Sequence, residues 1–504
     1  MQLVQNVPFF SLMLSMFSGI ISSILPGKWA RRLNAVMITA VAVLSAWLLI
    51  FLAQSNIGSY TYMMGHFPAP WGNELRAGVL EAGMALFFCV IMLLSLLGGR
   101  KKLDGEVEHS KHNIYYILCN LLLSSLLALI YTNDLFTAYV FVEINTIAAA
   151  GLIMIRQNGR CIEATVRYMI MSLLGSGLLL MGICMLYDLT GHLLMSNIKA
   201  QIALIVATQN YRVPLLITIG IMTVGLAIKS ALFPFHSWLP DAYGYSTVSS
   251  GAILSSLVSK GYIFLLIKLF YRVIGFENIS GSHVLNILFL FGLCDMIFGS
   301  VSAIWEKDIR RMIAFSSVAQ IGYIYMGFGL GTEAGVIASI FHMLTHAATK
   351  SLLFVSAIGL TDVSGGSRSF FEITGAGYRN KAAGAGFLVG ALSMVGIPIF
   401  SGFVSKLLFA EAAVLVPNWK LLPTLIVLAV STILNAVYFL KTVVRIYTPV
   451  APGILLEKGY FCLKFPAQKL YCVTIVLFII VNLILGMNSQ PIIRLIEEGL
   501  RNFA

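Results

Sequence analysis

Charged residues are scarce in this sequence. Only 11% of its 504 residues are Asp, Glu, Lys or Arg, whereas 59% are hydrophobic and the mean hydropathy is +0.90. A soluble domain would carry about a quarter charged residues. The many apolar runs of about twenty residues would find no core large enough in a soluble protein of this length. The composition excludes an ordinary soluble enzyme and indicates a polytopic membrane protein.

Motifs that hold cofactors or nucleophiles are also missing. The sequence has no glycine-rich phosphate loop, nucleophile motif or dinucleotide-binding fingerprint. Its seven cysteines include no C-x-x-C pair, and most lie inside apolar runs, which excludes an iron–sulfur ligand set. They are Cys89, Cys119, Cys161, Cys184, Cys294, Cys462 and Cys472. We therefore expect no cofactor in this chain and assign any redox chemistry to a partner.

Fourteen apolar runs predict fourteen transmembrane helices. They lie at roughly 8–25, 34–53, 78–98, 113–131, 135–155, 164–187, 213–232, 244–270, 284–304, 310–330, 333–360, 383–410, 421–445 and 471–488. The first run has no basic region before it and no small-residue cleavage site after it, so it is typical of a span and not of a signal peptide. The expected fold class is all-α and integral to the membrane, with residues 1–504 as one domain.

The net charge of +12 sits in short loops between the runs. Lys and Arg number roughly 21 in one set of alternate loops and about 7 in the other. The rich loops include Lys28 to Arg32, Arg100 to Lys102, Lys307 to Arg311 and Lys441 to Lys469. Because basic loops stay in the cytoplasm, both termini are predicted to face outside. A calmodulin-target or lipid-headgroup role for these loops is the alternative to a topological one, and no nucleic-acid partner is expected.

Two segments interrupt the helical pattern at membrane depth. They are Lys229–Asp241 (KSALFPFHSWLPD) and Gly396–Lys406 (GIPIFSGFVSK). Each contains a proline, a serine three residues later and a nearby lysine. Another pair of similar segments begins at Asn133 (NDLFTAYVF) and at Lys307 (KDIRRMIAF). The offsets within the two pairs are about 164 and about 174 residues, which nearly agree and indicate an internal repeat.

We infer two five-helix repeats, formed by spans 4–8 and 9–13, each with one broken helix. Because each repeat has an odd number of helices, the second must be inverted relative to the first, as is common in transporters. The expected subdivision is 1–110 for the first three spans, 111–275 for the first repeat, 282–450 for the inverted repeat, and 465–504 for the last span and a short tail.

Three ionisable residues in the first repeat lie in apolar surroundings. Glu143 is well inside a span, where an unpaired carboxylate costs several kcal/mol and therefore needs a partner or a proton. Lys229 precedes the first break, and Lys260 has apolar sequence on both sides. A Glu143–Lys229 pair could switch the lysine between charged and neutral forms, which predicts a proton gate. The alternatives are a neutral or helix-capping glutamate and a lysine that extends to the interface.

A polar stripe marks one span of the second repeat. In VIASIFHMLTHAATKSLLF, the residues His342, His346 and Lys350 follow one another at i, i+4 and i+8, which places them on one helix face. Titratable groups in register are typical of a proton wire, and histidine changes charge near neutral pH. A metal site is the less favoured alternative, because no Cys, Asp or Glu shares that face.

One more lysine and several additional residues complete the set of candidates. Lys406 follows the second break by one or two turns and is close in sequence to Glu411. Asp295 is an acid inside an apolar span with no obvious partner, and a structural role is as well supported as a functional one. His236, inside the first break, is a further candidate.

These segments resemble, in order and spacing, the antiporter-like membrane subunits shared by respiratory complex I, membrane-bound hydrogenases and Mrp-type sodium/proton antiporters. The matching pieces are FVEIN, IKSALFPFHSWLPDAY, SSLVSKGYI, EKDIRRMIAFSSVAQIGY, FHMLTHAATKSLLF and GIPIFSGFVSKLLF, which fall within about residues 110–445. The resemblance implies fourteen helices with inverted five-helix repeats. It also implies a proton path through Glu143, Lys229, Lys260, His342, His346 and Lys406.

Two positions refine the resemblance. Lysine at position 406 is similar to the Mrp D-type and hydrogenase subunits and unlike the complex I subunit that has glutamate there. Arg167 stands where the family usually has lysine, and arginine keeps its charge at physiological pH, so a switching role is doubtful at that position.

The resemblance leads us to expect a proton- or cation-translocating subunit, most similar to the Mrp D-type, in the cytoplasmic membrane of a prokaryote. Its partners would be other membrane subunits and the lipid bilayer. A proton-pumping subunit of a hydrogenase or complex I-like oxidoreductase is the main alternative. A quinone-binding enzyme subunit and a scaffold without transport are others, although a scaffold would not need the buried charges. The transported ion is expected to be H⁺, and transport of Na⁺ stays open.

Overall fold

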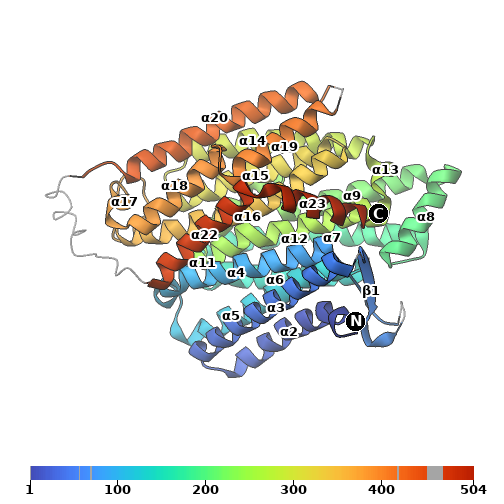
Figure 1. Cartoon of the computed structure of the whole chain (residues 1–504), viewed down its shortest axis with the longest axis horizontal. Helices are drawn as coiled ribbons and strands as arrows, with labels where there is room; N and C mark the ends of the chain where they lie inside the picture. Colours follow the sequence, from blue (N-terminus) through green and yellow to red (C-terminus); the bar gives the residue numbers. More distant parts are fainter. Residues whose placement is uncertain (1, 56, 68–70, 417–418, 451–468, 504) are drawn as a thin grey trace.

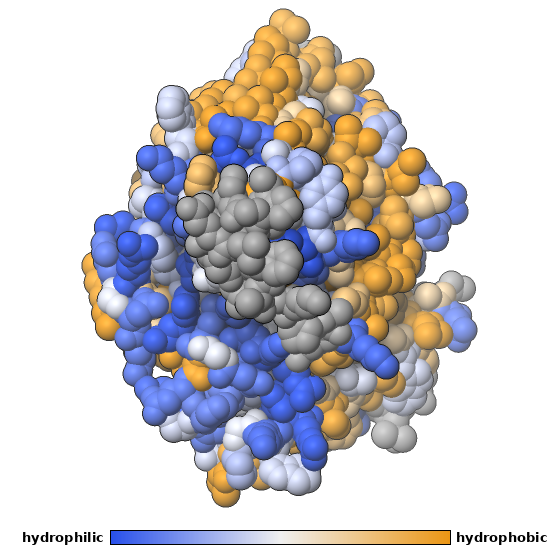
Figure 2. Space-filling view, turned by 90° about the vertical axis from the view of Figure 1, so that its left-hand side faces the viewer, coloured by the Kyte–Doolittle hydropathy of each residue, from blue (hydrophilic) through white to orange (hydrophobic). Residues whose placement is uncertain are grey.

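The computed structural model describes residues 2–55, 57–67, 71–416, 419–450 and 469–503. Long helices run side by side between two ends of the molecule, one carrying α17 (Ala376–Arg379) and the other carrying α8 (Met195–Thr208) and both termini (Figure 1). Seen end-on, the α17 end is largely hydrophilic and borders hydrophobic side faces (Figure 2). This distribution fits a bundle that crosses the membrane between these two ends.

The elements follow the predicted spans closely. The N-terminal group contains α1 (Gln2–Gln5), α2 (Val7–Ile24), α3 (Gly27–Ser55) and α4 (Val79–Glu106). The predicted first repeat contains η2 (His109–Lys111), α5 (His112–Tyr131), α6 (Leu135–Met154), α7 (Gly159–Thr190), α8, α9 (Arg212–Ser230), η3 (Phe235–Trp238), α10 (Leu239–Tyr245), α11 (Val248–Ile253), η4 (Leu254–Val258), α12 (Ser259–Lys268) and η5 (Leu269–Ile274).

A short helix, α13 (Phe276–Ile279), leads into the predicted second repeat. That repeat contains α14 (His283–Trp305), α15 (Ile309–Gly329), α16 (Glu333–Asp362), α17, α18 (Lys381–Val395), α19 (Ser401–Val414) and α20 (Leu421–Ile446). The chain ends with α22 (Lys469–Met487) and α23 (Ser489–Arg501).

Thirteen helical segments of the described chain are long and apolar enough to cross a membrane. The predicted twelfth span is not among them because it is split into α18 and α19, each too short to cross alone. The first break follows α9, at the end of the predicted seventh span, and separates α9 from η3 and α10. Left-handed residues, Ala231 (φ +65°) and Gly396 (φ +89°), end the two helices at these breaks. The prediction of an all-α membrane protein of about fourteen spans with two broken helices is confirmed.

Matching turns occur in the two repeats. Asp134 accepts a hydrogen bond from the Thr137 amide at the start of α6, and Asp308 accepts one from the Arg310 amide at the start of α15. Each aspartate also forms an isolated β-bridge, to Leu194 before α8 and to Ser369 before α17. Because α8 and α17 lie at opposite ends of the bundle (Figure 1), the two turns have the orientation that an inverted repeat requires.

Sequence reasoning missed several elements, among them α8, which lies between the predicted spans 164–187 and 213–232. Strands β1 (Ser59–Met63) and β2 (Glu74–Gly78) form an antiparallel hairpin where only a loop was expected. The expected short tail forms α23, an amphipathic helix whose buried residues include Ile493, Ile496 and Leu500. Arg76 of β2 donates to the backbone oxygen of Asn502, so the hairpin holds the end of the chain.

Glycines allow α7 and α9 to pack closely. A Cβ atom on Gly225 of α9 would lie 2.7 Å from the Gly175 oxygen and 2.9 Å from the Leu179 nitrogen of α7. Such contacts are shorter than real Cβ contacts, and the obstacles are backbone atoms that cannot rotate away. This crossing places the Lys229 end of α9 within the bundle.

We expect Gly225→Ala to destabilise the folded chain by about 1–3 kcal/mol, the usual cost of overpacking. The added methyl group forces the two helices apart, so the melting temperature of the purified protein should fall. Gly220→Ala in the same helix is the matched control, because no atom lies within 4 Å of the position of its Cβ. Equal melting temperatures for the two variants would contradict this account of the crossing.

Candidate ion-translocation site

Glu143 and Lys229 form the predicted pair. Nζ of Lys229 lies 3.9 Å from Oε1 of Glu143, and the lysine is fully buried whereas the glutamate is 25% exposed. The lysine donates a 2.8 Å hydrogen bond to the Thr146 hydroxyl, one turn along α6 from Glu143. Its position at the C-terminal end of α9 also favours a cation. The hydroxyl therefore holds the lysine, and the carboxylate lies close to it without a direct hydrogen bond.

Lys260 is fully buried on α12, directly after the π-helical turn η4. It donates to the Ser255 carbonyl within that turn. Turns of this kind are rare and frequent at functional sites. No carboxylate of the described residues lies within 4.0 Å of Lys260. The polar groups near this turn are serine hydroxyls. Ser255 contacts Ser317 at 3.0 Å, and Ser256 contacts Ser351 at 2.7 Å.

The predicted stripe on α16 faces the interior and not the lipid. His342, His346 and Lys350 are all at most 2% exposed. The two imidazole rings are stacked with centroids 6.0 Å apart. Nδ1 of His342 lies 2.5 Å from the Ser405 hydroxyl, whereas neither ring nitrogen of His346 has a hydrogen-bond partner among the described residues. His346 is thus a buried imidazole whose hydrogen-bonding capacity the described residues leave unused.

Lys350 and Lys406 are held by backbone and hydroxyl oxygens. Lys350 donates to the Ile313 carbonyl at 2.9 Å and to the Ser316 hydroxyl. Lys406 donates to the Val395 carbonyl at 2.7 Å, which the break after α18 leaves free, and to the Thr432 hydroxyl at 3.0 Å. The second break therefore supplies an acceptor for Lys406.

Two weaker candidates lie outside this set of contacts. Glu411 was expected near Lys406, but it lies on the exposed face of α19, and no ion pair between the two is present in the described structure. Five residues along a helix correspond to about 1.4 turns, which directs the two side chains apart. Arg167 is 54% exposed and pairs with Glu163 and Asp241 at the surface. It therefore does not belong to the group of ionisable side chains inside the bundle.

Asp295 has a partner that sequence reasoning did not identify. Its Oδ1 lies 3.5 Å from Nδ1 of His236, which belongs to the break of the first repeat. Asp295 is fully buried, and neither carboxylate oxygen has a hydrogen-bond partner among the described residues. Both residues were separate candidates, and the fold brings them together across the boundary between the repeats.

Further residues of the site were missed. Tyr323 stacks on His342 with centroids 5.3 Å apart, lies under the Lys406 ammonium at 5.8 Å, and donates to Ser431. Lys268 is fully buried and donates to the Leu129 and Ile130 carbonyls at the end of α5. The sequence contained a signal for Lys268, because it is a second lysine eight residues after Lys260. It also contained a signal for the polar side of α20, because the polar residues of that helix are regularly spaced. The buried polar residues of α20 are Thr424, Ser431, Asn435, Tyr438 and Thr442.

Helix packing sets the order of these groups across the bundle. Lys229 on α9 contacts α6, α9 packs against α12, η4 packs against α16, and α16 packs against α19. The residues therefore follow in the order Glu143, Lys229, Lys260, His346 with His342, and Lys406. Within the described residues, no three His, Cys, Asp or Glu side chains are arranged to hold a metal ion.

Comparisons with known proteins identify relatives of the chain. The family model described as NADH:quinone oxidoreductase/Mrp antiporter, TM, matches residues 132–434. The chain is 31% identical over 474 residues to NADH-quinone oxidoreductase subunit N of Desulforudis audaxviator, covering 91% of each sequence. It is 26% identical over 389 residues to the D-type subunit of the Na(+)/H(+) antiporter of Alkalihalophilus pseudofirmus, covering 77% of this chain and 76% of that protein.

Two solved structures share the fold. A chain of the Mrp complex from Dietzia sp. DQ12-45-1b superimposes with a TM-score of 0.85 at 21% identity. A chain of the membrane-bound sulfane sulfur reductase, an archaeal respiratory membrane complex, superimposes with a TM-score of 0.85 at 24% identity. Each match covers 100% of this chain and 98% of the other.

Proposed function

Because the chain belongs to the NADH:quinone oxidoreductase/Mrp antiporter family of membrane subunits, we propose that it translocates protons or other cations within a multisubunit membrane complex, most like the D-type subunit of an Mrp antiporter. The observation that carries the proposal is the row of ionisable side chains from Glu143 to Lys406, which is half-buried at these two ends and fully buried at Lys229, Lys260 and His346 between them. Buried charges at membrane depth are costly, so a row of them is retained for ion movement and not for stability.

We assign a separate role to each side chain of the row. Lys229 exchanges its contact with Glu143 as it gains or loses a proton, while Thr146 holds it in place. His346 and His342 accept and donate protons between Lys260 and Lys406. Water bridges the gaps that exceed hydrogen-bond reach. H⁺ is the proposed cargo of this row, and the proposal leaves any Na⁺ flux to the complex as a whole.

A second candidate is a proton-pumping subunit of a complex I-like oxidoreductase or a membrane-bound hydrogenase. The 31% identity to a subunit N over nearly the whole chain favours it. In that case the redox module belongs to other subunits. Mass spectrometry of the subunits that copurify with this chain separates the two candidates, because only the second predicts iron–sulfur proteins in the complex.

The proposal is tested by reconstituting the purified complex into sealed vesicles and following the internal pH after an imposed Na⁺ or electrical gradient. Proton movement that depends on this chain supports the proposed function. A complex that assembles completely and moves no protons under either gradient contradicts it.

We also propose that both termini face outside a prokaryotic cytoplasmic membrane, with the α17 end in the cytoplasm. The support is the excess of Lys and Arg in the loops at that end. Cysteines introduced at Gln5 and Arg501 should react with an impermeant thiol reagent in sealed cells. A cysteine at the exposed position of Lys28, at the start of α3 near the α17 end, should react only after lysis. The reverse pattern would place the basic loops outside.

A further inference from the structure

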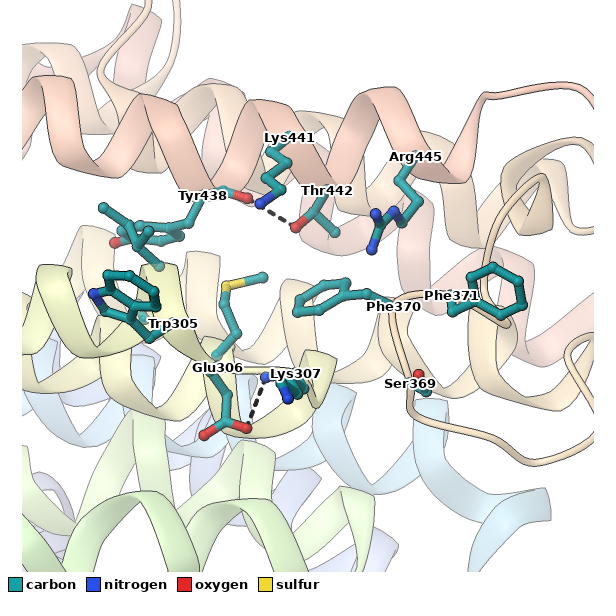
Figure 3. Close-up of a pocket in the computed structure, with 13 residues that line it drawn as sticks. Trp305, Glu306, Lys307, Ser369, Phe370, Phe371, Tyr438, Lys441, Thr442 and Arg445 are labelled. Carbon is teal, nitrogen blue, oxygen red and sulfur yellow. Dashed lines mark hydrogen bonds between the residues drawn. The ribbon is translucent and has the colours of Figure 1, made fainter.

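A cavity of about 380 Å³ lies near the α17 end of the bundle, between the end of α14, the start of α15, the segment 369–371 and the last turns of α20 (Figure 3). None of the side chains in the candidate ion path lines it. Its walls combine aromatic rings, among them Trp305 and Phe370, with cationic and hydroxyl side chains. The cavity therefore offers both apolar contact and charge to a ligand.

The charges of the cavity are predominantly positive. Lys307, Lys441 and Arg445 line it, and none of the three has a carboxylate within 4.0 Å among the described residues. Its one acidic residue, Glu306, already lies 3.5 Å from Arg311 and accepts a 2.9 Å hydrogen bond from the Lys307 amide. Three cations without carboxylate partners around one cavity favour an anion.

The cavity lies at the depth of the membrane interface. Trp305, the last residue of α14, is 79% exposed, as expected for a tryptophan at the boundary between lipid and water. Below it, the outer faces of α14 and α20 expose apolar side chains such as Phe298, Val301 and Val437. The positive cavity is thus continuous with a surface suited to acyl chains, at the end that carries the basic loops.

One wall of the cavity belongs to the polar face of α20. Thr442 and Tyr438 line the cavity, and the Tyr438 hydroxyl donates to Asn435 one turn deeper. One turn deeper still, Thr432 accepts the hydrogen bond from Lys406. A ligand that moves or fixes this end of α20 therefore acts on the helix that positions Lys406.

We propose that this cavity binds the anionic headgroup of a phospholipid of the same leaflet, with its acyl chains along α14 and α20. Lys307, Lys441 and Arg445 hold the phosphate, and Trp305 packs against the glycerol region. Bound lipid fixes the polar face of α20 and so keeps Thr432 in reach of Lys406. A measurement of transport tests this proposal on the basis of the proposed function, whereas a measurement of lipid binding does not depend on that function. Anionic lipids are recognised by basic pockets of this kind on the cytoplasmic side.

The test compares the wild-type complex, the double variant Lys441→Gln/Arg445→Gln and the control Lys28→Gln/Arg32→Gln, which removes two exposed cations from the start of α3 at the same end. Each is reconstituted in phosphatidylcholine alone, in phosphatidylcholine with phosphatidylglycerol, and in phosphatidylcholine with soluble inorganic phosphate. Proton transport is measured, and native mass spectrometry counts the phosphatidylglycerol that each complex retains.

We expect phosphatidylglycerol to raise transport several-fold in the wild type and the control and to leave the double variant unchanged. The double variant should also retain one lipid fewer. An equal lipid count and an equal stimulation in the double variant would overturn the proposal, as would full stimulation by inorganic phosphate. If no complex transports protons in any vesicle, the proposed function fails, and the lipid count alone then decides whether the headgroup site exists.

Discussion

Replacing Glu143 by glutamine is expected to reduce proton transport by about 100-fold or more, the size of the loss when a positioned proton-transfer group is removed. Glutamine preserves the shape of the side chain but cannot be ionised. Lys229, 3.9 Å away and fully buried, would then lose the charge that stabilises its protonated form. Because Thr146 still holds the lysine, the fold should persist. Transport in vesicles and the yield of assembled complex are the two measurements.

Glu163→Gln is the matched control for this substitution. Glu163 is a glutamate of α7 that is 62% exposed and pairs with Arg167 at the surface. Exposed ion pairs contribute about 0–1 kcal/mol, so the control should transport normally. Wild-type transport in the Glu143→Gln complex would remove Glu143 from the mechanism. A loss of assembly in that complex would assign it a structural role instead.

The second large effect is expected at the histidines of α16. Replacing both His342 and His346 by leucine should also lower transport by about 100-fold, because proton transfer between Lys260 and Lys406 then has no side-chain relay. Both histidines are buried, and His342 packs edge-on against Phe409, so leucine keeps these positions filled by an apolar side chain. Assembly should decrease only modestly, since the Ser405 hydroxyl loses one partner.

Single substitutions separate the contributions of the two histidines. His346→Leu removes a ring with no hydrogen bond in the described structure, so its effect on stability should be smaller than that of His342→Leu. Its effect on transport should nevertheless be large if the relay passes through it. His109→Leu, outside the bundle core on η2, serves as the control for loss of a histidine. A double variant with normal ion flux would refute the lateral order while leaving two separate half-channels.

The contacts explain why stability and transport should separate in these variants. Lys229, Lys350 and Lys406 each donate to hydroxyl or carbonyl oxygens and not directly to a carboxylate. Neutral acceptors can hold a lysine in either protonation state, because the ammonium donates to them and the neutral amine still retains two N–H groups. An isolated buried charge would be costly, but a lysine that can lose its proton avoids that cost.

Local sequence patterns accounted for the spans, the two breaks and the faces of the helices. In lipid, every crossing helix must satisfy its own backbone hydrogen bonds and be apolar along its length, so each span is visible in its own residues. The breaks at Pro234 and Pro398 were visible for the same reason, since a proline removes a hydrogen bond that lipid cannot replace. The register of His342, His346 and Lys350 followed from 3.6 residues per turn.

Tertiary packing decided which of these groups meet. Periodicity gives the face of a helix but not the helix that covers it, so nothing in the local sequence paired His236 with Asp295 or Lys406 with Thr432. The same limit explains the expectation that Lys406 lies near Glu411, which are neighbours in sequence but point in different directions on α19. Two further features depend on contacts with distant segments: the hairpin of β1 and β2, which holds the end of the chain, and the polar face of α20, which lies near Lys406. Local sequence does not specify these contacts, because they depend on how the helices pack together.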